Sequence, residues 1–339
     1  MKQTADEVRR VAAQLIKEER VKYVIGYAPG TDPARMMPFF ASSVRQAARL
    51  TWNPFCVPSL VKYLLDHRYA GTRLAVFVKG CDSRGLNRIL ADRQFARERV
   101  VALGLPCGGM LDRAKVLAEV GPDAELLAAE DRGDGYLLTT CLCRVRHGRQ
   151  AGRGSFEFPK RDFLLAKCLE CAHNVPLTAD KLIGPVVPSP ALPDSDRFAA
   201  VKRLESLEPA AKSAFWERRF ARCLRCYACR NVCPACNCKE CSFEQAVPGW
   251  QQGVCWVSKR TDPGQNGFFH LGRMMHVAGR CVDCDECGRV CPVNIPLREL
   301  YRKVQKDAQE LFGAAAAGVS PEETPLLSGY QEADPDEFK

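Results

Sequence analysis

The chain has 339 residues, of which 46% are hydrophobic, so it is long enough for one large or two ordinary domains without disulfide support. Its 19 cysteines are therefore expected to be reduced thiols of a cytoplasmic protein, where dense and regular cysteines indicate metal. The charged start "MKQTADEVRR" does not resemble a secretory signal, and no apolar run approaches the ~18 residues of a membrane span.

The first predicted element is an amphipathic helix near the start of the chain. Thr4-Ala-Asp-Glu7 has the form of a capping box. The apolar face of the helix consists of Val8, Val11, Leu15 and Ile16. Strands are expected next at 21–27, 73–80 and 99–106, with helical segments near 40–50, 57–67 and 83–97. This alternation predicts an α/β domain with a mainly parallel sheet that is covered on both faces.

Two of these strands end in cysteine, at Cys81 in "KGCDSRG" and Cys107 in "GLPCGG". Ligands of such sheets gather beyond the carboxyl ends of the strands. Cys81 also precedes a predicted helix, whose free N–H groups and dipole favour anions. The alternative for each cysteine is a small buried hydrophobic side chain.

A proline-rich connector at 184–196 separates this part from the second half of the chain. A helical stretch at 197–220, a cysteine-rich region at 223–291 and an amphipathic helix at 296–313 follow. We therefore predict four parts: a flavin and iron–sulfur α/β domain at 1–190, a linker and helix at 191–219, a ferredoxin-like two-cluster domain at 220–312, and a tail at 313–339.

The pattern CxxCxxCxxxCP occurs twice, starting at Cys223 and at Cys281. Its two-residue gaps let one turning backbone present three thiolates to a [4Fe–4S] cluster, while the fourth cysteine ligates the other cluster. One predicted ligand set is Cys223, Cys226, Cys229 and Cys291. The other is Cys281, Cys284, Cys287 and Cys233. Zinc is the alternative, but zinc ligands usually come as paired knuckles around one tetrahedral ion.

Residues 220–296 resemble bacterial-type two-cluster ferredoxin domains through these motifs. The resemblance is interrupted by a long insertion at about 234–280, which a free ferredoxin does not have. The second half is therefore expected to be a ferredoxin-like domain with an insertion and a C-terminal helix.

Cys168 and Cys171 lie in "KCLECAHNVPLTADKLIG" (167–184). Together with "VKGCDSRGLNRIL" and "GLPCGG", this motif resembles the family of the β subunit of deazaflavin-reducing hydrogenase and its dehydrogenase relatives, over about residues 20–190. The resemblance implies FAD, a further [4Fe–4S] cluster, and electron transfer between a flavin-like or nicotinamide carrier and an iron–sulfur chain. By it, the ligand candidates are Cys81, Cys107, Cys168 and Cys171.

Three cysteines remain directly after Cys233-Pro, in the frame CxCxxC: Cys236, Cys238 and Cys241. Exposed thiols so close to a cluster invite oxidation and misligation, so we predict that they ligate another cluster, with Cys255 as the fourth ligand. Cys56 or a non-cysteine group could replace Cys255, and a zinc site is the rival. Cys141 and Cys143 are either additional ligands or inert, and Cys56 is otherwise a core residue.

The function predicted from these patterns is electron transfer in a larger anaerobic oxidoreductase. By resemblance, the partners are heterodisulfide-reductase-like, hydrogenase or formate dehydrogenase subunits. An iron–sulfur electron wire without flavin is one alternative, and a zinc-bearing nucleic-acid-binding protein is another. No nucleic-acid partner is expected, because several clusters of about −2 charge each would offset most of the net charge of +9.

Overall fold

A computed structural model describes residues 2–31, 34–121, 124–142, 152–191, 196–245, 257, 261–314 and 316–324. By the contacts between its residues, the chain divides into two compact units. The first comprises Met1–Ser83 and Phe95–Ser195, and the second comprises Arg84–Gln94 and Asp196–Lys339. The predicted four-part division of the chain stays a prediction.

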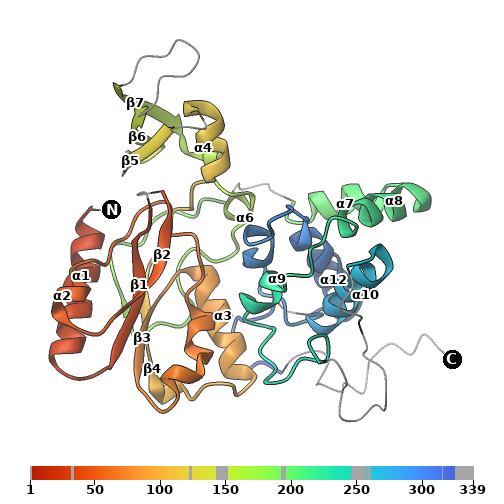
Figure 1. The fold of residues 1–339 in the computed structure, drawn as a ribbon. Helices are drawn as coiled ribbons and strands as arrows, with labels where there is room; N and C mark the ends of the chain where they lie inside the picture. The colour runs from red at the N-terminus through yellow and green to blue at the C-terminus, as the bar shows by residue number, and fades with distance from the viewer. Residues whose placement is uncertain are drawn as a thin grey trace. The chain divides into compact units, whose positions relative to one another are not determined.

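The first unit is built on a five-stranded sheet with the order β2-β1-β3-β4-β8 (Figure 1). Its strands are β1 (Tyr23–Pro29), β2 (Met36–Ala41), β3 (Leu74–Val78), β4 (Val100–Gly104) and β8 (Lys181–Leu182). The β1–β3, β3–β4 and β4–β8 pairs are parallel, while β1 and β2 are antiparallel. The mainly parallel sheet expected from the sequence is therefore confirmed.

Burial explains the central strands, because every residue of β3 and β4 is buried. Helix α1 (Lys2–Lys17) buries Val8, Val11 and Leu15, as its apolar spacing predicts. The predicted capping box is wrong, because Thr4 lies inside α1 and is itself buried. The Glu7 carboxylate instead accepts a hydrogen bond from the backbone N–H of Gly184, at 3.0 Å.

The helical segments between these strands are shorter than expected. The segment near 40–50 is reduced to α2 (Val44–Ala47), and the segment near 57–67 contains the 3₁₀ helix Val61–Leu65 and the 3₁₀ turn His67–Tyr69. Helix α3 (Gly80–Ala91) follows β3, and a 3₁₀ turn at Arg97–Arg99 leads into β4.

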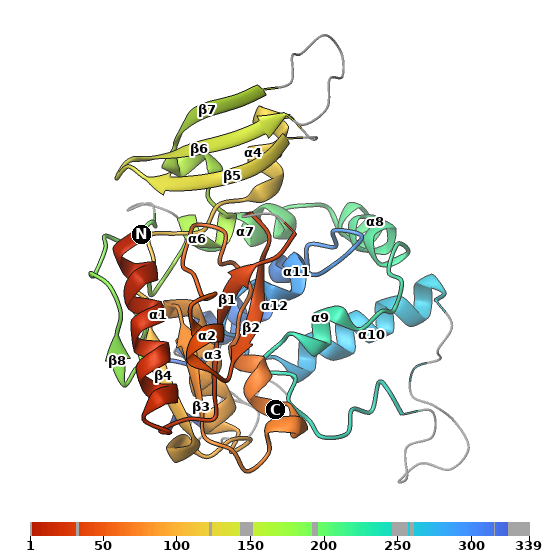
Figure 2. The same ribbon diagram turned by 60° about the vertical axis from the view of Figure 1, so that its left-hand side comes forward.

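The first unit also contains a small antiparallel sheet that the sequence analysis did not predict. Figure 2 shows its strands β5 (Ala124–Asp131), β6 (Gly135–Leu142) and β7 (Gly152–Pro159), in the order β5-β6-β7. Helix α4 (Arg113–Val120) precedes it, and the short helices α5 (Lys160–Phe163) and α6 (Ala166–Leu169) follow it. Leu126, Tyr136 and Phe158 are buried in it.

The described elements of the second unit are helical, apart from the loops that carry its cysteines. They include α7 (Ala199–Glu205), α8 (Pro209–Phe220), α9 (Ala228–Asn231), α10 (Pro263–His276), α11 (Glu286–Arg289) and α12 (Leu297–Phe312). Cys229 and Cys287 belong to the buried core of this unit, together with Phe269 and Tyr301. The closing helix expected at 296–313 is thus present as α12.

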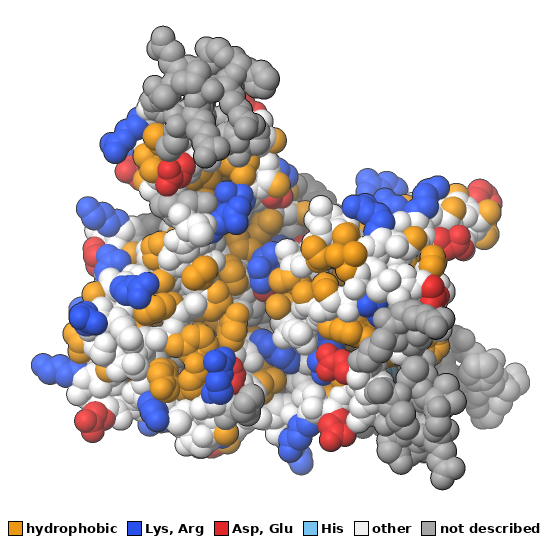
Figure 3. Space-filling view, viewed as in Figure 1, with side chains coloured by type: hydrophobic (Ala, Val, Ile, Leu, Met, Phe, Trp, Pro, Cys, Tyr) orange, Lys and Arg blue, Asp and Glu red, His pale blue; other side chains and the backbone are white. Residues whose placement is uncertain are grey.

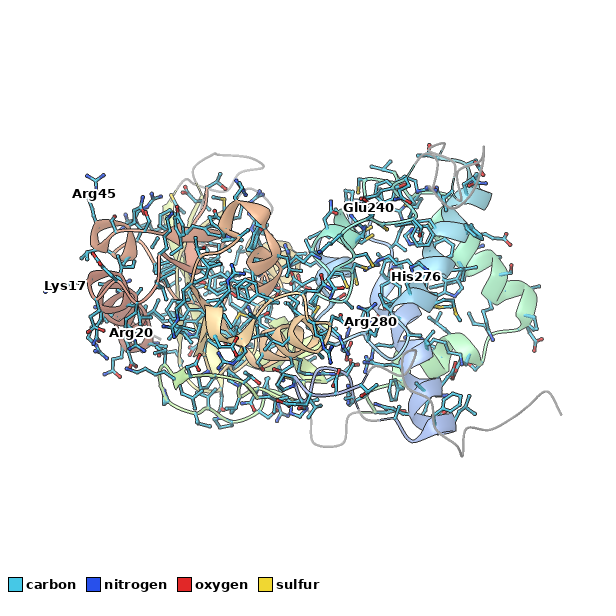
Figure 4. All side chains as sticks on the ribbon, turned by 90° about the horizontal axis from the view of Figure 1, so that it is seen from below. Lys17, Arg20, Arg45, Glu240, His276 and Arg280 are labelled. Carbon is cyan, nitrogen blue, oxygen red and sulfur yellow. The ribbon has the colours of Figure 1, made fainter. Side chains whose placement is uncertain are left out.

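Residues 84–94 lie in the second unit, and its C-terminal segment satisfies their buried side chains. The Arg84 guanidinium donates to the carbonyl of Ala317, at 3.0 and 2.8 Å, and Arg88 pairs with Glu323 at 2.8 Å. Asp92 accepts hydrogen bonds from Asn237 and Arg280, each at 2.6 Å, and Figure 4 labels Arg280. The start of the predicted tail therefore packs within the second unit.

On the face drawn in Figure 3, hydrophobic side chains are exposed at the surface between Lys and Arg side chains. Within the described part of the chain, no helix combines the length and the apolar character that a membrane span requires.

Candidate metal centres

The two cysteine motifs of the second unit fold into two loops that have the same backbone conformation. Arg225 and Tyr227 of the first loop have φ values of 52° and 58°, and Asp283 and Asp285 of the second loop both have 55°. These residues occupy matching positions, on either side of the second cysteine of each motif. Left-handed residues alternating along a loop turn successive N–H groups to one side, which forms an anion-binding concavity.

Backbone N–H groups of these loops donate to the cysteine thiols. Arg225 N–H donates to Cys223 Sγ at 3.4 Å, and Ile295 N–H donates to Cys291 Sγ at 3.3 Å. Asp283 N–H makes the corresponding bond to Cys281. Hydrogen bonds to sulfur stabilise the thiolate form, which is the form that binds metal.

The first predicted ligand set lies together. Cys223 is close enough to Cys291 and Cys226 for their charges to raise its pKa, after the larger effect of burial. Cys229 has Cys223 and Cys226 among its neighbours, and burial raises its pKa to about 11. The cysteine from the second motif, Cys291, thus lies with the three cysteines of the first.

The second predicted set surrounds a cavity. Cys233, Cys281, Cys284 and Cys287 all line it, together with Tyr301 of α12. Cys233 comes from the first motif and the other three cysteines come from the second. Four sulfur donors around one hollow, with N–H groups aimed at the thiols, fit an iron–sulfur cluster of the [4Fe–4S] type.

Charges around this cavity are strongly paired. The buried Asp283 carboxylate accepts from Arg298 at 2.7 and 3.2 Å and lies 3.6 Å from Arg302. Burial would raise the pKa of Asp283, but the two guanidinium groups outweigh burial and lower it. These arginines hold an ionised carboxylate inside the second loop and so fix its shape.

The three surplus cysteines after Cys233 have different surroundings. Cys236 is hydrogen-bonded to Cys233 and accepts from Arg273 Nε at 3.4 Å. Cys241 packs against the core, whereas Cys238 is exposed. Cys255 lies outside the described residues, so its predicted role as a fourth ligand stays a prediction.

Within the first unit, the loop that carries Cys171 lies against the start of α3. A Cβ atom at Gly80 would lie 1.9 Å from the carbonyl oxygen of His173, so only glycine fits there. On the other side of this loop, the Cys107 N–H donates to the carbonyl of Asn174 at 2.9 Å. The loop is thereby held next to both strand-end cysteines.

The four cysteines expected from the resemblance are neighbours. Burial, followed by the charge of Asp82, raises the pKa of the Cys81 thiol to about 12, and nearby Cys171 contributes to this rise. Cys168 and Cys81 act in the same way on Cys107, whose pKa burial raises well above its usual value. Gly109 N–H donates to the Cys107 thiol, and Met110 N–H donates to Cys168 Sγ at 3.4 Å.

A buried lysine accompanies this group of thiols. Lys79 Nζ pairs with Asp82 at 2.8 Å, donates to the Pro58 carbonyl at 3.1 Å and contacts the Tyr27 hydroxyl. Burial would lower its pKa, but Asp82 and the thiols of Cys81 and Cys107 outweigh burial and raise it. Lys79 is therefore a cation beside Cys81 and Cys107. A metal that binds Cys81 and Cys107 must displace their protons, since burial raises the pKa of both thiols.

The remaining cysteines differ from these sets. Cys56 is fully buried, its Sγ accepts from Asn53 N–H at 3.3 Å, and burial raises its pKa to about 12. It is a core residue in this structure. Cys141 lies in β6 opposite Glu125 and Arg153, and Cys143 lies outside the described residues.

Three residues that sequence analysis did not single out also belong to the sites. Lys79 could have been suspected from its place beside Gly80-Cys81, but no spacing signal marks Asn266 or Arg273. The Asn266 amide, fully buried on α10, donates to the carbonyls of Phe220 and Cys223 at 3.0 Å each and so holds the start of the first loop. Among the described residues, no three Cys, His, Asp or Glu side chains converge closely enough for a single metal ion.

Comparison with known proteins supports an iron–sulfur domain in the second half of the chain. Residues 219–295 match the family model of a 4Fe-4S dicluster domain. The F420-dependent formate dehydrogenase subunit beta of Methanocaldococcus jannaschii is 22% identical over 88% of both chains. The F420-dependent formate dehydrogenase 1 subunit beta of Methanococcus maripaludis is 24% identical over 93% of this chain and 91% of that one.

The chain is related to these beta subunits and contains a 4Fe-4S dicluster domain. Both resemblances seen in the sequence, to the deazaflavin-reducing β subunit family and to two-cluster ferredoxin domains, are thereby confirmed. A chain of the F420-reducing [NiFe] hydrogenase complex from Methanosarcina barkeri aligns over 49% of this chain and 58% of its own, with 12% identity and a TM-score of 0.38.

Proposed function

We propose that this beta-subunit relative is the electron-transfer subunit of a larger oxidoreductase. The observation that carries the proposal is that cysteines of the two motifs lie together, since Cys291 is near Cys223 and Cys226, and Cys233 lines one cavity with Cys281, Cys284 and Cys287. Clusters held by these sets would accept and release one electron at a time. Asn266, Asp283 and the N–H groups of the loops keep the thiols in place for that purpose.

The first unit supplies a further centre in this proposal. Cys81, Cys107, Cys168 and Cys171 would hold a third cluster, with Lys79 offsetting part of its negative charge. FAD would bind near it, as the resemblance implies. Because the relatives are named for F420 and formate dehydrogenase, the proposed electron carrier is a deazaflavin and the proposed partners are dehydrogenase or hydrogenase subunits. The protein would work in the cytoplasm.

The test is anaerobic purification of the full chain with its native partners, followed by iron, sulfide, zinc and flavin analysis. We expect about eight irons from the dicluster domain, with about four more for each further cluster. Reduced deazaflavin should bleach the visible absorption of the clusters. Iron without flavin would favour the electron wire, whereas zinc without iron would contradict the proposal and favour the zinc-bearing alternative.

A further inference from the structure

Arg273 is a buried guanidinium in the middle of the dicluster region. It lies on α10, in the insertion between the two motifs, and its exposed fraction is only 2%. A buried guanidinium is costly unless its charge and its N–H groups are compensated. The groups around Arg273 must therefore supply this compensation.

The contacts of Arg273 lead to the first cysteine loop, to Cys236 and to α12. Its Nη2 donates to the carbonyl of Cys229 at 3.0 Å, and its Nε donates to Cys236 Sγ at 3.4 Å. Its Nη1 donates to the hydroxyl of Tyr301, whose ring lines the cavity of the second set. The guanidinium carbon lies 4.7 Å from the centre of that ring.

No carboxylate of the described residues lies within ion-pair distance of Arg273. Two other buried arginines of the same unit do have carboxylate partners: Arg88 lies 2.8 Å from both Asp92 and Glu323, and Arg298 lies 2.7 Å from Asp283. The polar groups near Arg273 are instead the cysteine sulfurs and the hydroxyl of Tyr301, which burial keeps neutral by raising its pKa. Burial alone would lower the pKa of Arg273, but these groups raise it well above its usual value.

The positive charge of Arg273 acts on cysteines of both ligand sets. The guanidinium bonds to the Cys229 carbonyl of the first set, and through Tyr301 it borders the cavity that Cys233, Cys281 and Cys287 of the second set line. One fixed cation is thus within electrostatic reach of both predicted clusters.

We propose that the charge of Arg273 is a counter-charge shared by both clusters of the dicluster domain, and that it raises the reduction potential of each. This inference rests on the proposed function. Adding an electron makes a cluster more negative, so a fixed cation at short range in a poorly solvated interior stabilises the reduced form. The guanidinium stays charged throughout, because it does not lose its proton in proteins. Its bond to Cys236 gives one surplus cysteine a role in holding the guanidinium.

The experiment is an EPR-monitored redox titration of the anaerobic full-length protein. The variants are Arg273→Gln, which removes the charge, and Arg273→Lys, which keeps it. Arg218→Gln, at an exposed position of α8, is the control for loss of a solvent-exposed charge. The wild-type protein is measured first, and a wild type without clusters would overturn the proposed function itself.

For Arg273→Gln we expect the equilibrium constant of one-electron reduction to fall at least tenfold at both clusters, which is a shift of about 59 mV to lower potential. In Arg273→Lys and Arg218→Gln, the equilibrium constants of one-electron reduction should stay within twofold of the wild-type values. Unchanged potentials in Arg273→Gln, or a shift at one cluster only, would overturn the inference while the proposed function stands.

An equally large fall in Arg273→Lys would assign the effect to packing and would also overturn the inference. If Arg273→Gln assembles no clusters, Arg273→Lys decides alone. Equilibrium constants of one-electron reduction within twofold of the wild-type values would then support the counter-charge, and a tenfold fall in these constants would overturn it.

Discussion

The backbone of His173 lies against the α-carbon of Gly80, so that any side chain at Gly80 would overlap the His173 carbonyl. This close approach sets the loop of Cys171 beside Cys81. We expect Gly80→Ala to push the loop away and to lower the iron content by about four atoms per chain, with both dicluster EPR signals retained. Gly267→Ala, a helix position where the nearest atom to a Cβ lies 4.0 Å away, is the matched control and should keep all its iron.

The predicted exchange of the fourth cysteines between the motifs implies which variants share a phenotype. Cys233→Ser should weaken or abolish the same EPR signal as Cys284→Ser, and Cys291→Ser should affect the same signal as Cys226→Ser. Iron analysis and low-temperature EPR of the four variants test this. Grouping of Cys233→Ser with Cys226→Ser would contradict the ligand sets.

Sequence patterns predicted the parts of the fold that burial or ligand spacing dictates. Continuous apolar runs gave the central strands, and CxxCxxC spacing gave both cysteine loops. Strand β2, "MMPFFA", was missed because it has a proline and little alternation. The β5–β7 sheet was missed because strand pairing depends on contacts between different strands, which no pattern within a single strand indicates. No local pattern could indicate Arg273, because its partners come from distant segments.

The exposed position of Cys238 makes it the surplus cysteine of choice for a test of the additional cluster. Cys238→Ser should remove about four irons and leave the two dicluster signals in place, if Cys236, Cys238 and Cys241 are ligands. Ser242→Ala is the neighbouring control without a thiol. Loss of zinc with unchanged iron would support the rival zinc site, and no change in either metal would contradict both.

His270 is a buried histidine without a hydrogen-bond partner for either ring nitrogen among the described residues. Its ring stacks on Phe220 at 4.8 Å, and burial, followed by the charges of Arg273 and Arg225, lowers its pKa to about 3. The unfolded chain takes up this proton near pH 6.5. The folded state therefore has its full stability above pH 6.5, and this stability is lost progressively as the pH falls towards 3.

We expect His270→Phe to remove this dependence, because phenylalanine keeps the stacking and cannot be protonated. Between about pH 7.5 and 5.5, the wild type should lose about 1.4 kcal/mol more unfolding free energy than the variant. Anaerobic urea unfolding at both pH values measures this difference. His276→Phe, at the exposed end of the same helix, is the control, and equal losses in His270→Phe and the wild type would contradict the assignment.

Residues 84–94 have a consequence for the order in which the protein is made. The buried guanidinium of Arg88 meets Glu323, a residue that is 235 positions later in the chain. At about 5–20 residues per second, a ribosome needs roughly 10–50 s to cover that interval. During this time Arg84, Asn87 and Arg88 have left the ribosome without the carbonyls and the carboxylate that they will need. A nascent chain that stops before Ala317 therefore lacks the acceptors that these buried side chains use in the folded protein, although Arg88 keeps Asp92, and this gives quality-control proteases a reason to remove it.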